Sequence, residues 1–198
     1  MASSDADIIQ AVLGGDVERY AELVDKHQAM AFRLALSLLG HAEDAQDVSQ
    51  EAFVNAYRAL PRFRGGAQFS TWLYRIVVNE CKDAHKWRAR QPIVAAGSMA
   101  GGDQDTDGAG MFLDVPDPAA HPDDALSRRE LAHQVSGSIR ELPMKQRTAF
   151  VLHHIEGLTL DEVSAVMRCR VGTVKSHVFR ATERLRRQLG PWLAAEGS

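Results

Sequence analysis

The chain has 198 residues, enough for one domain or two small ones, and its composition is globular, with 45% hydrophobic and 25% charged residues. Its net charge of −3 excludes a uniformly basic protein that coats nucleic acid, and it has neither a secretory signal nor an apolar run of membrane-spanning length. Cys81 and Cys169 lack a CxxC neighbour, which argues against a disulfide framework or a cysteine-based zinc site. We therefore expect a cytoplasmic protein with no stable membrane insertion.

Helical periodicity runs through the N-terminal part and predicts a small bundle. Apolar residues spaced by three and four predict a helix over residues 8–13, which Gly14 and Gly15 interrupt. The pattern resumes over residues 17–39 and becomes apolar on more than one face, as in the central helix of a bundle. Gly40 then ends this helix, since glycine is common just beyond a helix terminus.

The next helix, over residues 41–60, has an acidic outer edge. Its apolar positions form an inner face, and the polar edge carries Asp44, Asp47, Gln50 and Glu51. Acidic residues early in a helix suit its dipole, which explains where Asp44 and Asp47 lie. The dipole does not explain an edge that continues to Glu51, so a second role is left open.

A loop over residues 61–71 combines arginines with aromatic rings. Arg64 lies beside Phe63, and Phe69 follows a Gly65-Gly66 pair that permits a tight bend. Rings that stack on bases, next to cations that contact the backbone, are typical of single-stranded nucleic-acid binding. Alternatively both rings plug the bundle, a role that we favour for Phe69 and leave open for Phe63.

Residues 70–90 are predicted to form a long helix with an apolar inner face and a basic far end. Trp72 and Cys81 can pack inward, and Cys81 needs no role beyond that of a small core residue. The polar and basic positions towards the far end are Asn79, Lys82, Lys86, Arg88 and Arg90.

Residues 91–125 break every helical pattern and carry seven Asp without Lys, Arg or Glu. Because the whole chain has a net charge of −3 and this segment −7, the rest of the chain carries a net +4. We interpret the segment as a flexible linker, whose 35 residues would span about 30–35 Å root-mean-square as a random coil. Its aspartates do not match an EF-hand, which needs a downstream Glu and flanking helices.

Two helices follow, over residues 126–142 and from Pro143 onwards. The second contains His153, His154 and Glu156, which could suggest a metal site. Adjacent histidines point about 100° apart on a helix, however, and this spacing differs from HExxH. We interpret these residues as an ordinary helix surface and expect no metal ion and no cofactor.

The stretch over residues 157–189 predicts a helix-turn-helix. Thr159 and Glu162 form a capping-box pattern ahead of the first helix, which Arg168-Cys169-Arg170 ends. Two short helices joined by such a tight turn are typical of this motif. The apolar seam of the second helix recurs at steps of three and four and comprises Val171, Val174, Val178, Ala181, Leu185 and Leu189.

The outward face of the second helix is polar and basic. It carries Thr173, Ser176, His177, Arg180, Arg184 and Arg187. Over residues 168–189 there are seven Lys and Arg against one Glu, so positive charge is concentrated where phosphates would lie. A helix fits the major groove, and its outward side chains can reach base edges. The pattern therefore favours DNA binding over a solvated amphipathic helix.

Three segments together resemble one protein family. DAQDVSQEAFVNAYRAL, FRGGAQFSTWLYRIVVNECKD and the stretch from ELPMKQRTAF to ERLRRQL are similar to bacterial sigma-70 family sigma factors of the extracytoplasmic-function (ECF) group. STWLYRIVVN at this distance before a helix-turn-helix is more specific than the helix-turn-helix alone. The resemblance implies an all-α fold with a sigma-2 domain (residues 1–90), a linker (91–125) and a sigma-4 domain (126–198).

The resemblance also implies partners and residue roles. Core RNA polymerase would dock on Asp44, Asp47, Gln50 and Glu51. The minus-10 promoter element would be recognised and melted by Phe63, Arg64, Trp72, Asn79, Lys82 and Arg88. The minus-35 element would be read by Thr173, Lys175, Ser176, His177, Phe179, Arg180 and Arg184. Such a protein is expected to be a monomer when free, and an anti-sigma factor usually holds it.

The chain departs from the family pattern in two ways. A basic residue is common in the family at the places of His177 and Thr182. Imidazole is neutral or a weak donor at pH 7, so its contact with phosphate or guanine would be weaker than that of arginine. The linker is also long and acidic, which suggests the hypothesis that it mimics nucleic acid.

Two other functions compete with this interpretation. A LuxR-like regulator has a similar C-terminal helix-turn-helix, but it needs an alternating strand and helix pattern upstream, and none occurs here. A metal-dependent hydrolase would be built on His153, His154 and Glu156. No glycine-rich phosphate loop, nucleophile elbow or paired carboxylates support catalysis. The sequence therefore predicts a promoter-specificity subunit and not an enzyme.

Overall fold

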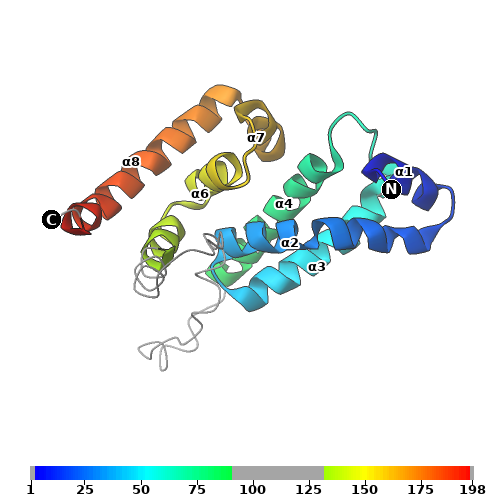
Figure 1. The fold of residues 1–198 in the computed structure, drawn as a ribbon, viewed down its shortest axis with the longest axis horizontal. Coiled ribbons are helices and arrows are strands. Elements are labelled where there is room, and N and C mark those ends of the chain that lie inside the picture. Colours follow the sequence, from blue (N-terminus) through cyan, green and yellow to red (C-terminus); the bar gives the residue numbers. More distant parts are fainter. Residues whose placement is uncertain (1–2, 91–131, 197–198) are drawn as a thin grey trace, which may run out of the picture.

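The computed structural model describes residues 3–90 and 132–196, and every regular element within these ranges is helical. The first range contains α1 (Asp5–Leu13), the 3-10 turn η1 (Val17–Arg19), α2 (Tyr20–Leu39), α3 (Ala42–Ala59), the 3-10 turn η2 (Leu60–Arg62) and α4 (Phe69–Arg90). The second contains a helix over residues 132–140, α6 (Met144–Phe150), the π-helical segment η5 (Val151–Ile155), α7 (Leu160–Met167) and α8 (Val171–Glu196) (Figure 1). The prediction of an all-α protein with two helical domains is confirmed. The expected linker, residues 91–125, lies outside the described residues.

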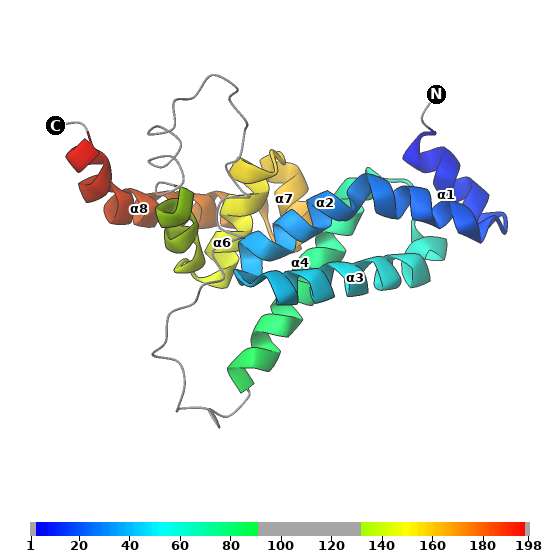
Figure 2. The same cartoon turned by 60° about the horizontal axis from the view of Figure 1, so that its bottom comes forward.

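Three long helices make the first domain, in which α2, α3 and α4 pack against one another (Figure 1). α1 begins with a capping box between Ser4 and Asp7. Asp5 ties α1 to α2, since its carboxylate lies 2.8 Å from Nζ of Lys26 and 2.8 Å from Nε2 of His27. The last turns of α4 project beyond the bundle (Figure 2). The fully buried side chains of this domain include Ile8, Leu23, Leu34, Leu38, Leu60, Leu73 and Val77.

The second domain is built on α8, which packs against α6 and α7. Of the predicted seam, Val174, Ala181 and Leu185 are buried and Val171, Val178 and Leu189 are half-buried. The backbone of α8 stays helical beyond this seam to Glu196. No helix of the described residues is long and apolar enough to cross a membrane.

The periodicity of the second domain does not predict the widened turn at η5. The amide of Glu156 donates to the carbonyl of Val151 (2.9 Å), five residues back, and the amide of Leu158 donates to the carbonyl of Leu152 (2.9 Å). Such π-turns are rare and occur often at functional sites. Here the turn places Nδ1 of His153 at 2.8 Å from the carbonyl oxygen of Leu158.

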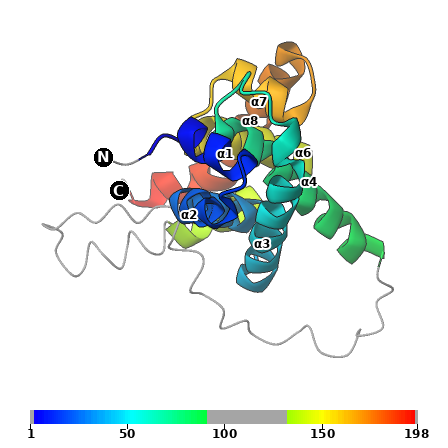
Figure 3. The same ribbon diagram turned by 90° about the vertical axis from the view of Figure 1, so that its right-hand side faces the viewer.

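The two domains also pack against each other. α4 lies against α7, and α2 lies against α6 and η5 (Figure 3). The buried apolar side chains of both domains form one continuous cluster. The sequence pattern predicts two bundles but contains no sign of this contact, because each bundle already has a complete apolar face of its own.

Gly40 ends α2 in a left-handed conformation, and we expect it to tolerate no side chain. Its φ is +81°, and a Cβ built there would lie 2.5 Å from Cδ of Arg140 in the second domain. Gly40→Ala should lower the free energy of unfolding by about 1–2 kcal/mol, because alanine is unfavourable in this conformation. Urea unfolding followed by circular dichroism measures the loss.

Gly172→Ala is the control for this prediction. Gly172 lies in the first turn of α8, and a Cβ there would meet no atom within 4 Å. Alanine is the better helix former, so this variant should be as stable as the wild type or more stable. Equal losses at both glycines would show that the conformation of Gly40 does not limit stability.

Candidate nucleic-acid and polymerase interfaces

α7 and α8 meet as the two helices of a helix-turn-helix. The hydroxyl of Thr159 accepts from the amide of Glu162 (3.3 Å), and the Glu162 carboxylate accepts from the amide of Thr159 (2.8 Å), so the predicted capping box is confirmed. The hydroxyl of Thr159 also donates to the Glu162 carboxylate (2.7 Å), and this bond, together with that from the Thr159 amide, holds the pKa of Glu162 below its usual value. Arg168 ends α7 with φ +52°, a left-handed conformation that residues other than glycine rarely adopt. The tight turn between the helices therefore contains a strained residue.

The outer face of α8 is exposed and basic. Lys175, Ser176 and Arg180 are exposed, and so are Thr173 and Arg184 on either side of them. The seam on the opposite side of the helix is buried against α6 and α7. The helix is thus held by one face and leaves the other free for a ligand.

His177 lies at the edge of this face and differs from its neighbours. It is half-buried, and its Nδ1 is buried without a hydrogen-bond partner among the described residues. Burial, together with the positive charges of Lys145 and Arg180, lowers the pKa of its imidazole. The neutral form therefore dominates at pH 7, so His177 can approach a phosphate or a guanine only as a weak, uncharged donor.

Phe179 projects from the other edge of α8, and 66% of it is exposed. It lines a shallow groove of about 450 Å³ together with Leu160 of α7 and with Lys175 and Arg186 of its own helix. An exposed ring between cations can contact the methyl group of thymine while its neighbours contact phosphates. The position of Phe179 is therefore compatible with a role in DNA binding.

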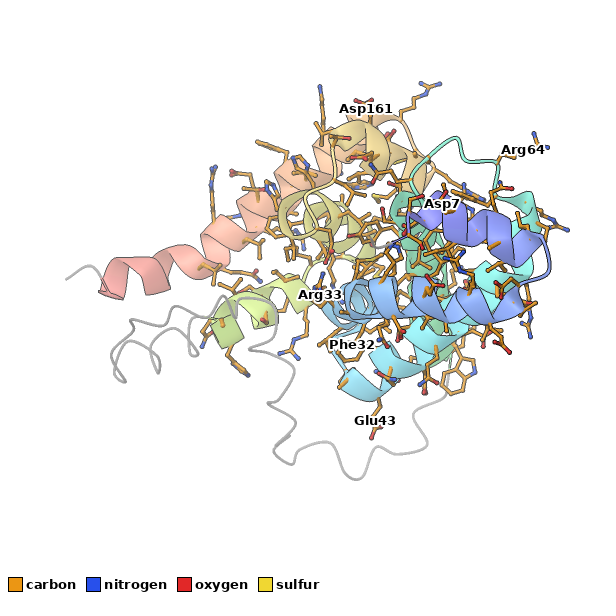
Figure 4. All side chains as sticks on the ribbon, turned by 45° about the vertical axis from the view of Figure 1, so that its right-hand side comes forward. Asp7, Phe32, Arg33, Glu43, Arg64 and Asp161 are labelled. Carbon is orange, nitrogen blue, oxygen red and sulfur yellow. The ribbon has the colours of Figure 1, made fainter. Side chains whose placement is uncertain are left out.

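Phe63 of the loop before α4 packs with two rings from the first turn of α4 into one aromatic cluster. The ring of Phe63 lies 5.1 Å from that of Trp72 and 6.0 Å from that of Phe69. Phe69 is only 3% exposed, so its predicted role as a core plug is confirmed. Phe63 and Trp72 are half-buried at the surface of the cluster, and Arg64 points away from the ribbon beside them (Figure 4). The cluster thus offers two rings on a rigid base.

One stripe of α4 carries most of the other residues predicted for the same site. At 3.6 residues per turn, Trp72, Asn79 and Lys82 fall on one side of the helix. Arg75 and Lys86 fall on that side as well. Arg75 was not among the predicted residues of this stripe, although it lies three residues after Trp72 and therefore falls on the same side of a helix.

Lys82 lies where this stripe meets the second domain. Burial lowers the pKa of its ammonium group, and the positive charges of Lys86, Lys145 and Arg168 lower it further. Lys145 and Arg168 belong to the second domain. The stripe therefore continues into positive charge on α6 and at the end of α7.

Arg88 lies on the opposite side of α4 from this stripe and pairs with Asp44 of α3. Its Nη2 is 2.7 Å from Oδ2 of Asp44, which is half-buried. Arg88, which was predicted to contact the minus-10 element, is thus paired with Asp44, which was predicted to contact core polymerase. The exposed part of the acidic edge consists of Asp47, Gln50 and Glu51.

A groove of about 470 Å³ runs between α2 and α3 beside this acidic edge. The groove is lined by Val24, Gln28, Ala29, Phe32, Gln46, Ser49, Gln50 and Phe53. Gln50 belongs to both the groove and the acidic edge, and Phe32 projects near the start of α3 (Figure 4). Periodicity cannot reveal this groove, because Phe32 and Phe53 also fit core positions. An apolar floor with amides and carboxylates at its rim suits an amphipathic helix.

His153, His154 and Glu156 do not converge on a common ligand position. His153 is bound to the Leu158 carbonyl, the ring of His154 lies 4.8 Å from that of Phe150, and Glu156 accepts a hydrogen bond from Tyr74. In the part of the chain that the structure describes, no group of three or more His, Cys, Asp and Glu could hold a metal ion.

Two family models and several curated relatives match the chain. The model for sigma-70 region 2 matches residues 23–91, and the model for sigma-70 region 4 matches residues 133–185. The RNA polymerase sigma-H factor of Pseudomonas aeruginosa is 38% identical over 96% of this chain and 95% of its own. The ECF RNA polymerase sigma factor SigW of Bacillus subtilis is 35% identical over 91% of this chain and 94% of its own. This chain belongs to the ECF group of the sigma-70 family.

Solved structures agree with this ECF sigma factor in fold. The sigma factor RpoE from Bartonella quintana, solved with the anti-sigma factor NepR, matches 86% of this chain and 96% of its own, with a TM-score of 0.65 and 22% identity. CnrH, solved with the cytosolic domain of CnrY, matches 96% of this chain and 99% of its own, with the same TM-score and identity.

The first domain is therefore sigma-2 and the second is sigma-4, and the LuxR-like alternative finds no support. Sigma factors are transcription initiation factors rather than enzymes. The family assignment gives each surface described above a place in one process.

Proposed function

We propose that this ECF sigma factor docks on core RNA polymerase and directs it to promoters through two DNA-reading surfaces, with no catalysis of its own. One observation carries the proposal: α8 of a capped helix-turn-helix buries its apolar seam and exposes a basic outer face. Polymerase and chromosome are cytoplasmic in bacteria, so we place the protein in the cytoplasm.

Core polymerase docks on the α2–α3 groove and the acidic edge beside it. The groove supplies an apolar floor that includes Phe32 and Phe53. Asp47, Gln50 and Glu51 are exposed at its rim, where they can steer a basic partner helix. Asp44 contributes indirectly, because its ion pair with Arg88 joins α3 to α4.

The minus-10 element is recognised and melted by the aromatic cluster and the α4 stripe. Phe63 and Trp72 present rings on which an extruded base can stack. Arg64 follows Phe63 on the loop, and Asn79 and Lys82 continue the stripe along α4, where they can contact the displaced backbone. Arg88 remains outside this surface as long as it pairs with Asp44.

The minus-35 element is read by α8 in the major groove. Lys175, Ser176 and Arg180 lie on the exposed face, with Phe179 at its edge. Thr173 precedes them and Arg184 follows one turn later, where they would meet the flanking phosphates.

An anti-sigma factor is a further partner in this proposal. RpoE and CnrH, which share this fold, were solved with NepR and CnrY. An inhibitor acts by covering a surface that polymerase or DNA needs, and the α2–α3 groove would accept one amphipathic helix of such a partner.

Charge reversal at the acidic edge should weaken binding to core polymerase. Asp47→Lys combined with Glu51→Lys places two cations where a basic partner would dock, so the dissociation constant should rise about tenfold or more. A titration of fluorescently labelled sigma factor with core polymerase measures it. Asp16→Lys with Glu18→Lys is the matched control, because these exposed residues carry the same charge and lie at η1, away from the groove. Equal weakening by both pairs of substitutions would show that the effect comes from the net charge of the protein and not from the acidic edge.

Phe63→Leu should impair promoter melting more than initial binding. Leucine keeps the apolar packing of the cluster but removes the ring, and stacking on one base is worth about 1–3 kcal/mol. The rate of open-complex formation should therefore fall about tenfold, while closed-complex affinity stays near that of the wild type. Permanganate reactivity of unpaired thymines follows melting over time.

Phe69→Leu separates packing from stacking in this experiment. Phe69 is buried in the same cluster and cannot reach DNA, so Phe69→Leu should lower the stability of the protein. At a temperature well below the unfolding transition of this variant, it should still melt the promoter. If Phe63→Leu melts DNA as fast as Phe69→Leu, Phe63 has only a packing role.

Variants of α8 should change how the minus-35 element is chosen. Arg180→Ala should cost about 1–3 kcal/mol and relax the preference at one base pair if Arg180 contacts a guanine edge. His177→Arg should instead tighten binding to all sequences and steepen the salt dependence by about one unit, since it adds a charge where a neutral imidazole stands. Selection from randomised minus-35 DNA, with affinities at several salt concentrations, distinguishes the two effects. Identical selected sequences and affinities for both variants and the wild type would exclude α8 as the reading helix.

A further inference from the structure

Two neighbouring residues of α2 bind one carboxylate of α1. Nζ of Lys26 lies 2.8 Å from Oδ1 of Asp5, and Nε2 of His27 lies 2.8 Å from Oδ2. Burial alone would raise the pKa of Asp5, but the hydrogen bonds from Lys26 and His27 hold it below its usual value. The carboxylate is therefore ionised at neutral pH and can only accept hydrogen bonds, so the Nε2 atom of His27 carries a proton.

His27 differs from Lys26 in what lies on its other side. Its ring is 5.2 Å from the ring of Phe69, at an interplanar angle of 53°. The side chain of His27 is 15% exposed, whereas that of Lys26 is 37% exposed, and its ammonium group also donates to the carbonyl of Ser3 (2.8 Å). One residue of the pair thus faces the aromatic cluster, and the other faces the residues just before α1.

The aromatic cluster is built in layers on His27. Phe69, which is 3% exposed, lies 5.6 Å from Trp72 and 6.0 Å from Phe63 in ring-centroid distance. Phe63 and Trp72 are the half-buried rings at the surface of the cluster. The series of contacts therefore runs from Asp5 through His27 and Phe69 to the two rings on which a base could stack.

A ring that receives an extruded base binds it best when the ring is already fixed. Ordering a side chain at the moment of binding costs free energy, and a ring that its neighbours hold in advance avoids this cost. Phe63 lies on a loop, where the backbone is more mobile than in a helix. Its ring therefore depends on support from the side chains beneath it, and His27 at the base of that support is held by a carboxylate on another helix.

We propose that Asp5 and His27 are positioning residues for promoter melting. Through Phe69 they hold the two rings at the surface of the cluster in place for stacking on an extruded base. The inference rests on the proposed function, in which those rings receive that base. It gives α1 a role in melting through contacts within the protein alone. Phe69→Leu keeps an apolar side chain between His27 and Trp72, so part of this support remains in that variant.

His27→Gln tests the inference in promoter melting with core polymerase. Glutamine can still donate to Asp5 but has no ring to place against Phe69, so the rate of open-complex formation should fall about three- to tenfold. Closed-complex affinity should stay near that of the wild type, because the rings act only after a base leaves the stack. Permanganate reactivity over time gives the rate, at a temperature well below the unfolding transition of each variant.

Lys26→Met is the matched control. It removes the other cation bound to the same carboxylate at the same distance and leaves the contact between His27 and Phe69 in place, so the wild-type rate should remain. Asp5→Asn should also melt the promoter near the wild-type rate, because its amide oxygen can accept from Nε2 of His27, whereas Asp5→Ala should slow melting. A loss in Lys26→Met as large as that in His27→Gln would show that only the attachment of α1 matters, and would overturn the inference.

Fluorescence anisotropy decay of Trp72 tests the positioning without polymerase or DNA. With Trp87→Phe and Trp192→Phe in every variant, Trp72 is the only tryptophan of the chain. His27→Gln should increase the amplitude of its fast ring motion, on the picosecond to nanosecond timescale, and Lys26→Met should not. Unchanged ring motion in His27→Gln, or an unchanged melting rate, would overturn the inference. Failure of the wild type with core polymerase to melt a promoter would instead overturn the proposed function.

Discussion

The packing of α4 is the constraint on which the rest of the structure depends. Its inner face buries Leu73, Val77 and Cys81 against α2 and α3, and the burial of Cys81 raises the pKa of its thiol to about 12. Another part of its surface packs on α7, and the remaining stripe presents Trp72 and Lys82. A helix of this length can serve three surfaces only because its side chains recur every 3.6 residues. Any rotation of α4 would therefore change the core, the domain contact and the proposed promoter surface together.

Local chemistry made much of this predictable from the sequence. The capping box at Thr159, the glycine that ends α2 and the Val174–Ala181–Leu185 seam each depend on residues within about three helical turns of one another. The bond between Tyr74 and Glu156 joins two helices far apart in the chain, and nothing in either helix pattern requires it. The pairing of Asp44 with Arg88 escaped prediction for the same reason, since both residues also fit an exposed helix face. The site was thus predictable as helix faces, but not as contacts between faces.

Charge is separated between the two kinds of surface. Asp47 and Glu51 are exposed on α3, whereas the cations gather on α4, the end of α7 and α8. A carboxylate edge repels DNA and attracts a basic protein helix. The same chain can therefore bind a polyanion on its basic surface and a basic protein helix on its acidic edge. The net charge of −3 hides this separation, because it sums over surfaces that never share a partner.

The domain seam places like charges where an ordinary core would place apolar groups. Lys82 sits half-buried near Lys145 and Arg168, which is unfavourable unless an anion or open solvent relieves it. In the proposed function Lys82 contacts promoter DNA, and a phosphate there would relieve the repulsion. The electrostatic cost of packing Lys82 near Lys145 and Arg168 would therefore favour binding of a polyanion at this seam.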